Sequence, residues 1–227
     1  MNLTYKGKTK DVYTMEDGNI LLQFKDDATG ENGVFDPGAN EVALSIEGLG
    51  MSNLGMTDYF LRLCQDAGIP THYISADLAK GTMTVLPAEI FGQGVEVICR
   101  FRSTGSFIRR YGRYAKEGEP LDALVEVTLK DDERKDPPIT RDALEALGIL
   151  TGEEHDILKT LTQRISTLIK NDLARKGMEL YDIKLEFGRV GADKTIALID
   201  EVAAGSMRVY KDGEKLDPME LCRLTLA

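Results

Sequence analysis

Apolar and polar positions in the first part of the chain predict strands followed by an amphipathic helix. Residues 3–24 largely alternate and are punctuated by Gly7 and Gly18, which is typical of short strands joined by tight turns. Helical spacing follows over residues 40–68. It is clearest from Thr57 onward, where one stripe contains Phe60, Leu61, Cys64 and Ala67.

A change of pattern near residue 90 indicates a boundary between two lobes. Residues 71–75 and 82–86 read as short strands, but periodicity is lost over residues 86–94, which contain one proline and two glycines. We therefore expect an N-terminal lobe at residues 1–90 that covers a nucleotide, and a C-terminal lobe at residues 91–227 with the metal, phosphate and substrate sites.

The second half mixes strands and helices in an irregular order. Strand patterns and one short helical pattern cover residues 95–101, 125–129, 140–148, 178–187 and 194–200. The clearest helix begins at Thr151, where Thr-Gly-Glu-Glu matches a capping box with Glu154, and it ends at Gly177. Because strands outnumber helices without a repeating strand-helix-strand order, we predict an α+β fold.

The composition limits the chemistry available to the chain. Its 227 residues include 28 Lys and Arg against 38 Asp and Glu, and the net charge of −10 argues against nucleic acid or an anionic membrane as a partner. Two histidines exclude a His-rich metal site and argue against a Ser-His-Asp triad. The three widely spaced cysteines are expected to be reduced packing residues. Catalysis would therefore depend on Lys, Arg, Asp and Glu.

No segment resembles a secretory signal or a membrane span. Met1 to Lys10 is polar and alternating, and no stretch approaches the roughly 18 apolar residues that a membrane span needs. We therefore expect a cytoplasmic protein.

The segment Gly7-Lys8-Thr9-Lys10 is the first candidate binding site. A lysine that extends from a glycine-containing turn can hold a nucleotide phosphate as a point charge. The segment is not a Walker A loop, because the upstream glycine and the strand-to-helix context are absent. On its own pattern, a solvated lysine turn is the simpler interpretation.

The segment from Arg100 to Lys116 is the second candidate. It contains six basic residues and no acidic residue. Alternation places Arg100 and Arg102 opposite an apolar strand face, toward solvent or a cleft, and the Ser-Thr-Gly-Ser turn that ends at Ser106 precedes an expected helix start. Arginine forks and helix-start N–H groups both favour an oxyanion, so the pattern suits a phosphate site. An ordinary basic surface is an equally good interpretation.

The third candidate is a set of carboxylates on the expected C-terminal hairpin. Asp182, Lys184 and Glu186 share one face of a strand. If the connecting loop contains an odd number of residues, Asp200 lies on the same face as Glu186. Such a pair suits Mg²⁺, which takes one or two carboxylates and leaves positions for phosphates and water. Taken alone, the pattern is also that of a half-solvated antiparallel strand.

Several sequence blocks stand in a distinctive order, namely GKTKDVY, CRFRSTGSFIRRYG, LKDDERKDPPIT, YDIKLEFG, and IDE followed by MRVY. This order resembles the phosphoribosylaminoimidazole-succinocarboxamide synthase family, the SAICAR synthetases, from about Tyr5 to Asp217. The resemblance implies a two-lobed α+β fold similar to ATP-grasp ligases, with the nucleotide cleft between the lobes, and a homodimer. It also implies ligation of L-aspartate to the carboxylate of a phosphoribosyl aminoimidazole carboxylate in purine biosynthesis, while ATP becomes ADP and phosphate.

The resemblance further implies roles for individual residues. Nucleotide-binding positions are matched by Lys8, Lys10, Lys184 and Glu186, and the Mg²⁺ ligands by Glu186 and Asp200. Residues that hold the substrate phosphate are matched by Arg100, Ser106 and Arg208. The block that faces aspartate is matched by Lys130 and Asp136. Lys184 and Asp200 are the implied catalytic residues.

A reaction of this kind needs no protein nucleophile. A carboxylate is a poor electrophile, so ATP is expected to convert it to an acyl phosphate, which the aspartate amine then attacks. Lysine and Mg²⁺ would offset the charge that moves onto ADP.

The chain departs from the family pattern at four places. Gly48-Leu49-Gly50 replaces Gly-Lys-Gly, Ala203-Ala204-Gly205 replaces Ser-Pro-Asp, and an acidic residue after the arginine is replaced in Val209-Tyr210-Lys211. The chain also ends soon after Asp217, short of the family's usual C-terminal helix. Three alternatives therefore stay open. They are a relative that uses another acceptor with ATP, a non-catalytic nucleotide-binding regulatory protein, and an α+β interaction module without a nucleotide site.

Overall fold

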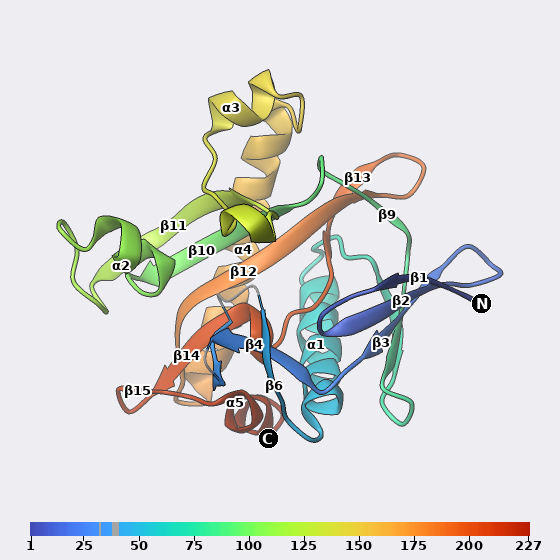
Figure 1. Ribbon diagram of the computed structural model, residues 1–227, viewed down its shortest axis with the longest axis horizontal. Helices are drawn as coiled ribbons and strands as arrows, with labels where there is room; N and C mark the ends of the chain where they lie inside the picture. The colour runs from blue at the N-terminus through green and yellow to red at the C-terminus, as the bar shows by residue number, and fades with distance from the viewer. Residues whose placement is uncertain (32, 38–40) are drawn as a thin grey trace. The chain divides into compact units, whose positions relative to one another are not determined.

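The computed structural model describes residues 1–31, 33–37 and 41–227, and it divides into two compact units (Figure 1). The first unit comprises Met1–Glu89, Arg189–Ser206 and Asp217–Ala227, and the second comprises Ile90–Gly188 and Met207–Leu216. The domains predicted from sequence were two continuous segments, 1–90 and 91–227. In the structure, two later segments return to the first unit instead.

The first unit is built on an antiparallel sheet of five strands in the order β1-β2-β3-β8-β7. These strands are β1 (Asn2–Lys6), β2 (Lys10–Thr14), β3 (Ile20–Phe24), β7 (Tyr73–Asp77) and β8 (Thr82–Val85). The helix α1 (Leu49–Asp66) contacts β3 and β7. Its buried residues include Phe60, Leu61 and Cys64, so the stripe predicted from Thr57 onward faces the core.

The start of α1 differs from the sequence prediction. Helical spacing was expected from residue 40, which lies outside the described residues, but residues 42–45 form the strand β6 (Val42–Ser45), which pairs with β4 (Asp27–Glu31). The Asp26 carboxylate accepts hydrogen bonds from the backbone N–H groups of Gly48 and Gly50, at 3.1 and 2.9 Å. A carboxylate at this position satisfies helix N–H groups and interacts favourably with the helix dipole, which fixes the helix start at Leu49.

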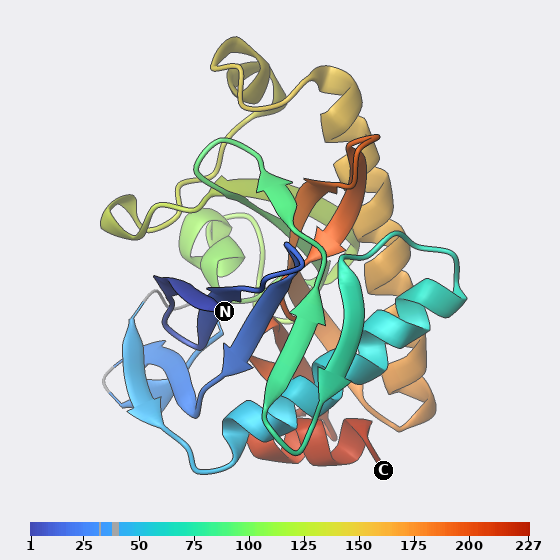
Figure 2. The ribbon, with the colours of Figure 1, turned by 90° about the vertical axis from the view of Figure 1, so that its right-hand side faces the viewer.

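The first unit also contains a C-terminal helix that the sequence analysis did not expect. The helix α5 (Pro218–Thr225) is capped by Asp217, whose side chain accepts from two backbone N–H groups, and it has proline at its first position. It contacts α1 and the short 3₁₀ helix η2 (Ala204–Ser206), and Figure 2 shows it alongside α1. The Ala203-Ala204 segment is buried, so these small residues form part of the core of this unit.

The second unit contains most of the other large sheet, whose main path is β11-β10-β12-β14-β15. Two further strands pair with β12: β13 (Thr195–Ile199), which belongs to the first unit, and β9 (Ala88–Ile90), in which Ile90 alone belongs to the second. The strands of the main path are β10 (Val95–Arg102), β11 (Pro120–Leu129), β12 (Glu179–Val190), β14 (Met207–Lys211) and β15 (Glu214–Lys215). The remaining elements of the second unit are helices: α2 (Ser106–Tyr111), the 3₁₀ helix η1 (Asp132–Arg134), α3 (Arg141–Ala146) and α4 (Gly152–Arg175). The first unit also includes the two-residue strand β5 (Val34–Phe35).

One face of this second sheet is covered by α4, which contacts β10 and β11. The predicted capping box is confirmed, because Thr151 Oγ1 accepts from Glu154 N at 3.2 Å and Glu154 Oε2 accepts from Thr151 N at 2.8 Å. Leu158, Ile165 and Ile169 of the helix are buried, as is the Val95-Val97-Cys99-Phe101 face of β10. This apolar packing leaves the opposite face of the sheet for polar side chains.

Within the described residues, no helix is long and apolar enough to cross a membrane.

Replacing Thr151 by alanine is expected to lower the free energy of unfolding by about 1 kcal/mol, because the N–H of Glu154 loses its cap. Urea denaturation followed by circular dichroism measures this change. The exposed Thr160, within the same helix, provides the control, since Thr160→Ala should be neutral or slightly stabilising. An equal loss in both variants would contradict a capping role.

Candidate functional site

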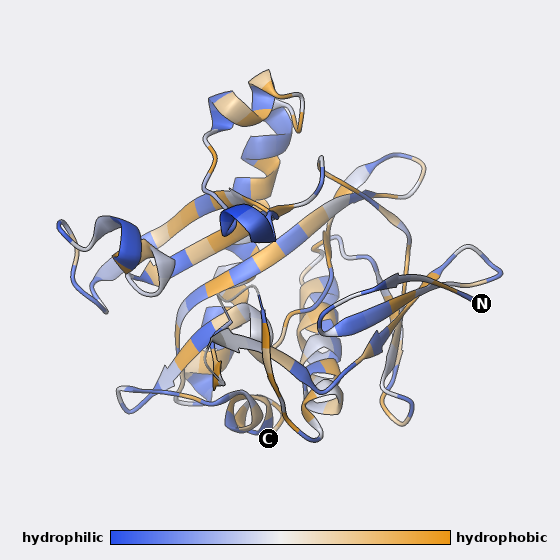
Figure 3. Cartoon of the chain, in the orientation of Figure 1, coloured by the Kyte–Doolittle hydropathy of each residue, from blue (hydrophilic) through white to orange (hydrophobic). Residues whose placement is uncertain are grey.

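The face of the second sheet opposite α4 carries rows of charged residues, which we call the polar face. β10 and β12 pair so that Glu96 lies opposite Glu186 and Arg100 lies opposite Asp182, while Arg208 of β14 lies on the other side of Asp182. Figure 3 shows hydrophilic and hydrophobic residues alternating along these strands. The shared face predicted for Asp182, Lys184 and Glu186 therefore continues across three neighbouring strands.

Arg100 is the most deeply buried charge on the polar face, with 1% of its side chain exposed. Its Nη1 donates to Asp182 Oδ2 at 2.6 Å, and its Nε donates to Glu126 Oε2 at 2.6 Å. Arg208 Nη1 donates to the same oxygen of Asp182 at 3.0 Å. The sequence predicted that Arg100 faces solvent or a cleft. Exposure to solvent is wrong, because neighbouring strands place carboxylates beside this side chain and bury it.

The three residues matched to a phosphate site are brought together here. Arg100 Nη2 donates to Ser106 Oγ at 2.9 Å, so the Ser106 hydroxyl keeps its own hydrogen to donate elsewhere. Gly105 has φ of 55°, and a Cβ on it would lie 2.8 Å from Arg208 Cζ. Glycine at this position therefore lets the Arg208 guanidinium approach the turn that carries Ser106.

The basic segment from Arg100 to Lys116 is only partly a free positive surface. Arg102 Nε donates to Glu179 Oε1 at 2.5 Å, and Arg110 Nη2 donates to Glu126 Oε1 at 2.5 Å. Together with the pairs of Arg100, these contacts engage half of the six basic residues of the segment with carboxylates from β11 and β12. Half of the predicted strip of positive charge is thus engaged in ion pairs with neighbouring carboxylates.

Lys184 lies in the next row of the polar face. Its Nζ is 2.7 Å from Glu96 Oε1, and Glu96 Oε2 accepts from the Thr128 hydroxyl at 3.2 Å. Desolvation opposes the charged ammonium, but the carboxylates of Glu96 and Glu186 outweigh it and raise the pKa of Lys184 above its ordinary value. Lys184 is therefore a permanent cation in the middle of the sheet, suited to binding phosphate rather than to acting as a base.

Glu186 and Lys130 form a second pair at the edge of this row. Lys130 Nζ donates to both carboxylate oxygens of Glu186, at 2.7 and 2.9 Å. Asp136 lies in the loop after β11, where its Oδ1 accepts from Asp131 N at 2.8 Å and its φ is 47°. Asp136 thus stabilises the short loop that follows Lys130.

The first unit contains a separate charged group around Lys10, at the start of β2. The buried Lys10 Nζ lies 3.2 Å from Asp200 Oδ1 and 2.9 Å from Glu201 Oε1. Burial alone would lower the pKa of Lys10, but the two carboxylates overcome that effect and raise it. Lys8 is exposed at the turn before β2, which Gly7 tightens by donating its N–H to Lys10 O at 2.9 Å.

Asp200 has an unusual backbone, with φ of 63° directly after β13. Four residues, 191–194, connect β12 to β13, so the predicted condition of an odd loop is not met. Strand alternation in any case does not orient Asp200, because the residue follows the strand in a left-handed conformation. Such conformations cost of order 1–3 kcal/mol for residues other than glycine, and they concentrate at functional sites.

These carboxylates fit a hard cation bound with help from other oxygens. Glu201 Oε2 is buried and has no hydrogen-bond partner among the described residues. The described residues contain no cluster of three His, Cys, Asp or Glu side chains that could hold a metal by themselves. Mg²⁺ normally takes one or two protein carboxylates and fills its remaining positions with phosphate oxygens and water, so the donor set suits that ion.

Sequence reasoning missed Glu96, Glu126 and Glu201 as members of these groups. Glu96 could have been found by alternation, since it shares the strand face of Arg100. Glu126 could not, because its contact with Arg100 depends on the pairing of β10 with β11. Buried His72 was also missed; desolvation lowers its pKa to about 4, so the imidazole next to the Asp200 backbone is neutral.

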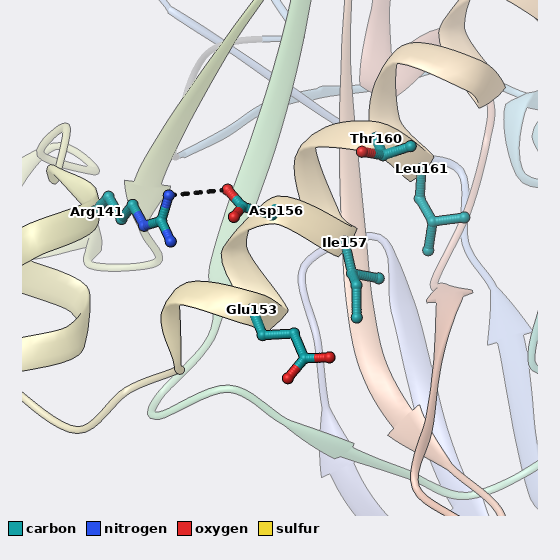
Figure 4. Close-up of a pocket in the computed structure, with 6 residues that line it drawn as sticks. All are labelled: Arg141, Glu153, Asp156, Ile157, Thr160 and Leu161. Carbon is teal, nitrogen blue, oxygen red and sulfur yellow. Dashed lines mark hydrogen bonds and ion pairs between the residues drawn. The ribbon is translucent and has the colours of Figure 1, made fainter.

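A surface hollow at the start of α4 contains none of the candidate residues (Figure 4). Arg141 Nη1 of α3 donates to Asp156 Oδ1 of α4 at 3.0 Å there, and Ile157 and Leu161 also line the hollow. The residues that line this hollow belong to α3 and α4, and none of them belongs to the polar face.

Comparison with known proteins gives a consistent result over nearly the whole chain. The profile of the SAICAR synthetase family matches residues 3–220. A phosphoribosylaminoimidazole-succinocarboxamide synthase from Clostridium tetani is 62% identical over 226 residues, covering 100% of both chains, and one from Finegoldia magna is 36% identical, covering 96% of this chain and 90% of that relative.

Solved structures agree with the α+β fold. A structural-genomics SAICAR synthetase gives a TM-score of 0.82 at 34% identity, covering 99% of this chain and 100% of the other. A type-2 SAICAR synthetase in complex with ADP gives a TM-score of 0.83 at 28% identity, covering 94% and 87%. The predicted α+β class and the family resemblance are both confirmed.

Replacing Asp182 by alanine is expected to lower the free energy of unfolding by roughly 3–5 kcal/mol, because Arg100 would keep its charge in the interior without this partner. Urea denaturation provides the measurement. Glu179→Ala is the control, since this half-exposed residue pairs with Arg102 nearer the surface and should cost below about 1 kcal/mol. Similar losses of unfolding free energy in the two variants would contradict the view that a buried ion pair is costlier to break than an exposed one.

Proposed function

The chain belongs to the SAICAR synthetase family, and from that premise we propose how its own residues carry out the reaction. It is a phosphoribosylaminoimidazole-succinocarboxamide synthase, a ligase of purine biosynthesis. The full-length relative at 62% identity favours this activity over a different acceptor or a non-catalytic role. The observation that carries the site proposal is the convergence of Arg100, Ser106 and Arg208 on one face of the second sheet.

We propose that this convergence binds the phosphate of the ribotide substrate. The buried pair of Arg100 with Asp182 fixes the guanidinium, and Ser106 accepts from it, which leaves the serine hydrogen to donate to a phosphate oxygen. Arg208 adds a second guanidinium held by the same carboxylate. Several charge-assisted donors fixed in advance would orient the ribotide carboxylate for attack.

The nucleotide positions are proposed for Lys8 and Lys10 in the first unit and for Lys184 and Glu186 in the second. The related type-2 enzyme was solved with ADP, which supports a nucleotide as ligand. The raised pKa values of Lys10 and Lys184 keep both ammonium groups charged at neutral pH, so each can offset phosphate charge. The predicted cleft between the lobes stays a prediction.

Glu186 and Asp200 are the proposed Mg²⁺ ligands. When bound, Mg²⁺ would neutralise phosphate charge and orient the phosphate oxygens. The Asp200 carboxylate lies 3.2 Å from Lys10 Nζ, and the Glu186 carboxylate accepts from Lys130 Nζ at 2.7 Å, so each acid has a neighbouring cation that positions it. Lys184 and Asp200 are the proposed catalytic residues.

L-aspartate is the proposed partner of Lys130 and Asp136. Lys130 supplies an ammonium suited to a carboxylate of the amino acid, and Asp136 fixes the loop that follows it. Attack by the aspartate amine on the activated ribotide carboxylate, proposed to be an acyl phosphate, would then form the amide C–N bond and break the C–O bond to the phosphate. Phosphate would leave, and the amine would lose a proton. We also propose a cytoplasmic homodimer, which rests on the family resemblance.

Lys184→Ala and Asp200→Asn are each expected to lower the rate of aspartate-dependent ADP release roughly 100-fold or more, because each removes a charge from the nucleotide or metal site. A coupled ADP assay with the ribotide, with and without aspartate, measures the rate. Lys80→Ala is the control, since Lys80 is 77% exposed and pairs with Asp77 in a surface turn. Unchanged activity in both site variants would overturn the site assignment.

Removal of Mg²⁺ is expected to weaken ADP binding at least about tenfold in the unmodified protein, because phosphate charge is then less well neutralised. Isothermal titration calorimetry with and without the metal measures this ratio. Glu186→Gln and Asp200→Asn should shrink the ratio toward one, whereas Glu133→Gln, an exposed acid on η1, should not. A full metal effect in both site variants would contradict the proposed ligands.

A further inference from the structure

We propose that Glu126 is a positioning residue, which fixes Arg100 and Ser106 relative to each other for binding of the substrate phosphate. This inference rests on the proposed function, in which Arg100 and Ser106 bind that phosphate. Glu126 itself would not touch the ribotide. It would act through the two arginines that its carboxylate holds.

The two oxygens of the Glu126 carboxylate serve different structural elements. Oε2 accepts from Nε of Arg100, which belongs to β10, at 2.6 Å. Oε1 accepts from Nη2 of Arg110, which belongs to α2, at 2.5 Å. Glu126 itself belongs to β11 and is 13% exposed. One carboxylate thus joins the strand of Arg100 to the helix that begins at Ser106.

The helix α2 needs such a link because little else anchors it. Its six residues include none that is buried, and no side chain caps its N-terminus. Its Phe107 ring centroid lies 5.8 Å from the Arg100 guanidinium, which is a polar contact rather than apolar packing. Without a buried apolar face, a short helix gains little from packing, and polar contacts then determine where it lies.

Glu126 also completes the orientation of the Arg100 guanidinium. Asp182 and the Thr104 carbonyl accept from Nη1, and Ser106 accepts from Nη2, so these contacts all involve the outer nitrogens. The hydrogen bond from Nε to Glu126 holds the remaining edge of the planar guanidinium. A guanidinium held on every edge cannot rotate, and this fixes the direction of its Nη2 donors.

If only the net charge mattered, neutralising Glu126 would have the opposite effect on phosphate binding from the loss of a positioning residue. Arg100, Arg110 and Arg208 carry three positive charges, and Glu126 and Asp182 carry two negative charges, so the group has a net charge of +1. Neutralising Glu126 raises this to +2, which by charge alone would strengthen binding of an anion. If Glu126 positions Arg100 and Ser106, its neutralisation must weaken binding instead.

The test is steady-state kinetics of the full-length chain, with ADP release as the readout. Glu126→Gln is expected to raise the KM for the ribotide about tenfold, with kcat and the KM for ATP changed less than about twofold. Glu126→Asp keeps the charge but is too short to reach both arginines, so it should also raise the KM for the ribotide. Glu179→Gln is the matched control, since it neutralises the carboxylate on β12 that pairs with Arg102 and should leave all constants unchanged.

Arg110→Met tests the link to α2. It should raise the KM for the ribotide by itself, and the double variant with Glu126→Gln should be no worse than Glu126→Gln alone to within about twofold. Thermal denaturation identifies any variant that does not fold. The KM for the ribotide is then compared among the variants that do fold.

Two results would overturn the inference. One is a KM for the ribotide that is unchanged or lower in Glu126→Gln, and the other is a normal value in Glu126→Asp. Arg100→Lys separates this failure from failure of the proposed function. If Arg100→Lys raises the KM for the ribotide and Glu126→Gln does not, only the role of Glu126 is wrong, whereas no effect of Arg100→Lys would refute the phosphate site itself.

Discussion

A buried arginine determines the organisation of the second unit. Arg100 has 1% of its side chain exposed, and a charge in such a place is tolerated only when acidic partners and hydrogen bonds surround it. Asp182 and Glu126 supply these from the strands on either side, and Asp182 recruits Arg208 as well. The face of the sheet opposite α4 is therefore constrained to be an ordered array of charges, on which a phosphate site can be built without an apolar pocket.

The charged group of the first unit follows the same principle, again with a buried cation between two carboxylates. There a buried lysine, Lys10, stands between two acids, Asp200 and Glu201, and one oxygen of Glu201 has no partner among the described residues. The left-handed backbone of Asp200 directs its carboxylate in a way that the preceding strand does not dictate. Both groups fit a ligase that stabilises charge during phosphoryl transfer and has no need of a nucleophilic side chain.

The departures from the family pattern are compatible with the fold. Gly50 packs so closely on Lys25 that a Cβ would lie 2.8 Å from its carbonyl atoms, so glycine is required there whatever residue stands at position 49. The Ala203-Ala204 segment is fully buried next to α5, whose presence the sequence analysis did not anticipate. The C-terminal segment is too short for strong periodicity, and its helix depends on the Asp217 cap and on contact with α1.

By itself, the sequence determined the α+β class, the capped helix α4, the strand face shared by Asp182, Lys184 and Glu186, and the family. These features depend on local spacing and on residue order, which the chain carries directly. Only the tertiary structure decided that Arg100 is buried, that Glu126 joins two arginines, and that the chain returns twice to its first unit. Those outcomes depend on which strands pair and in what register, and residues such as Arg100 and Asp182, 82 positions apart, meet only once that pairing exists.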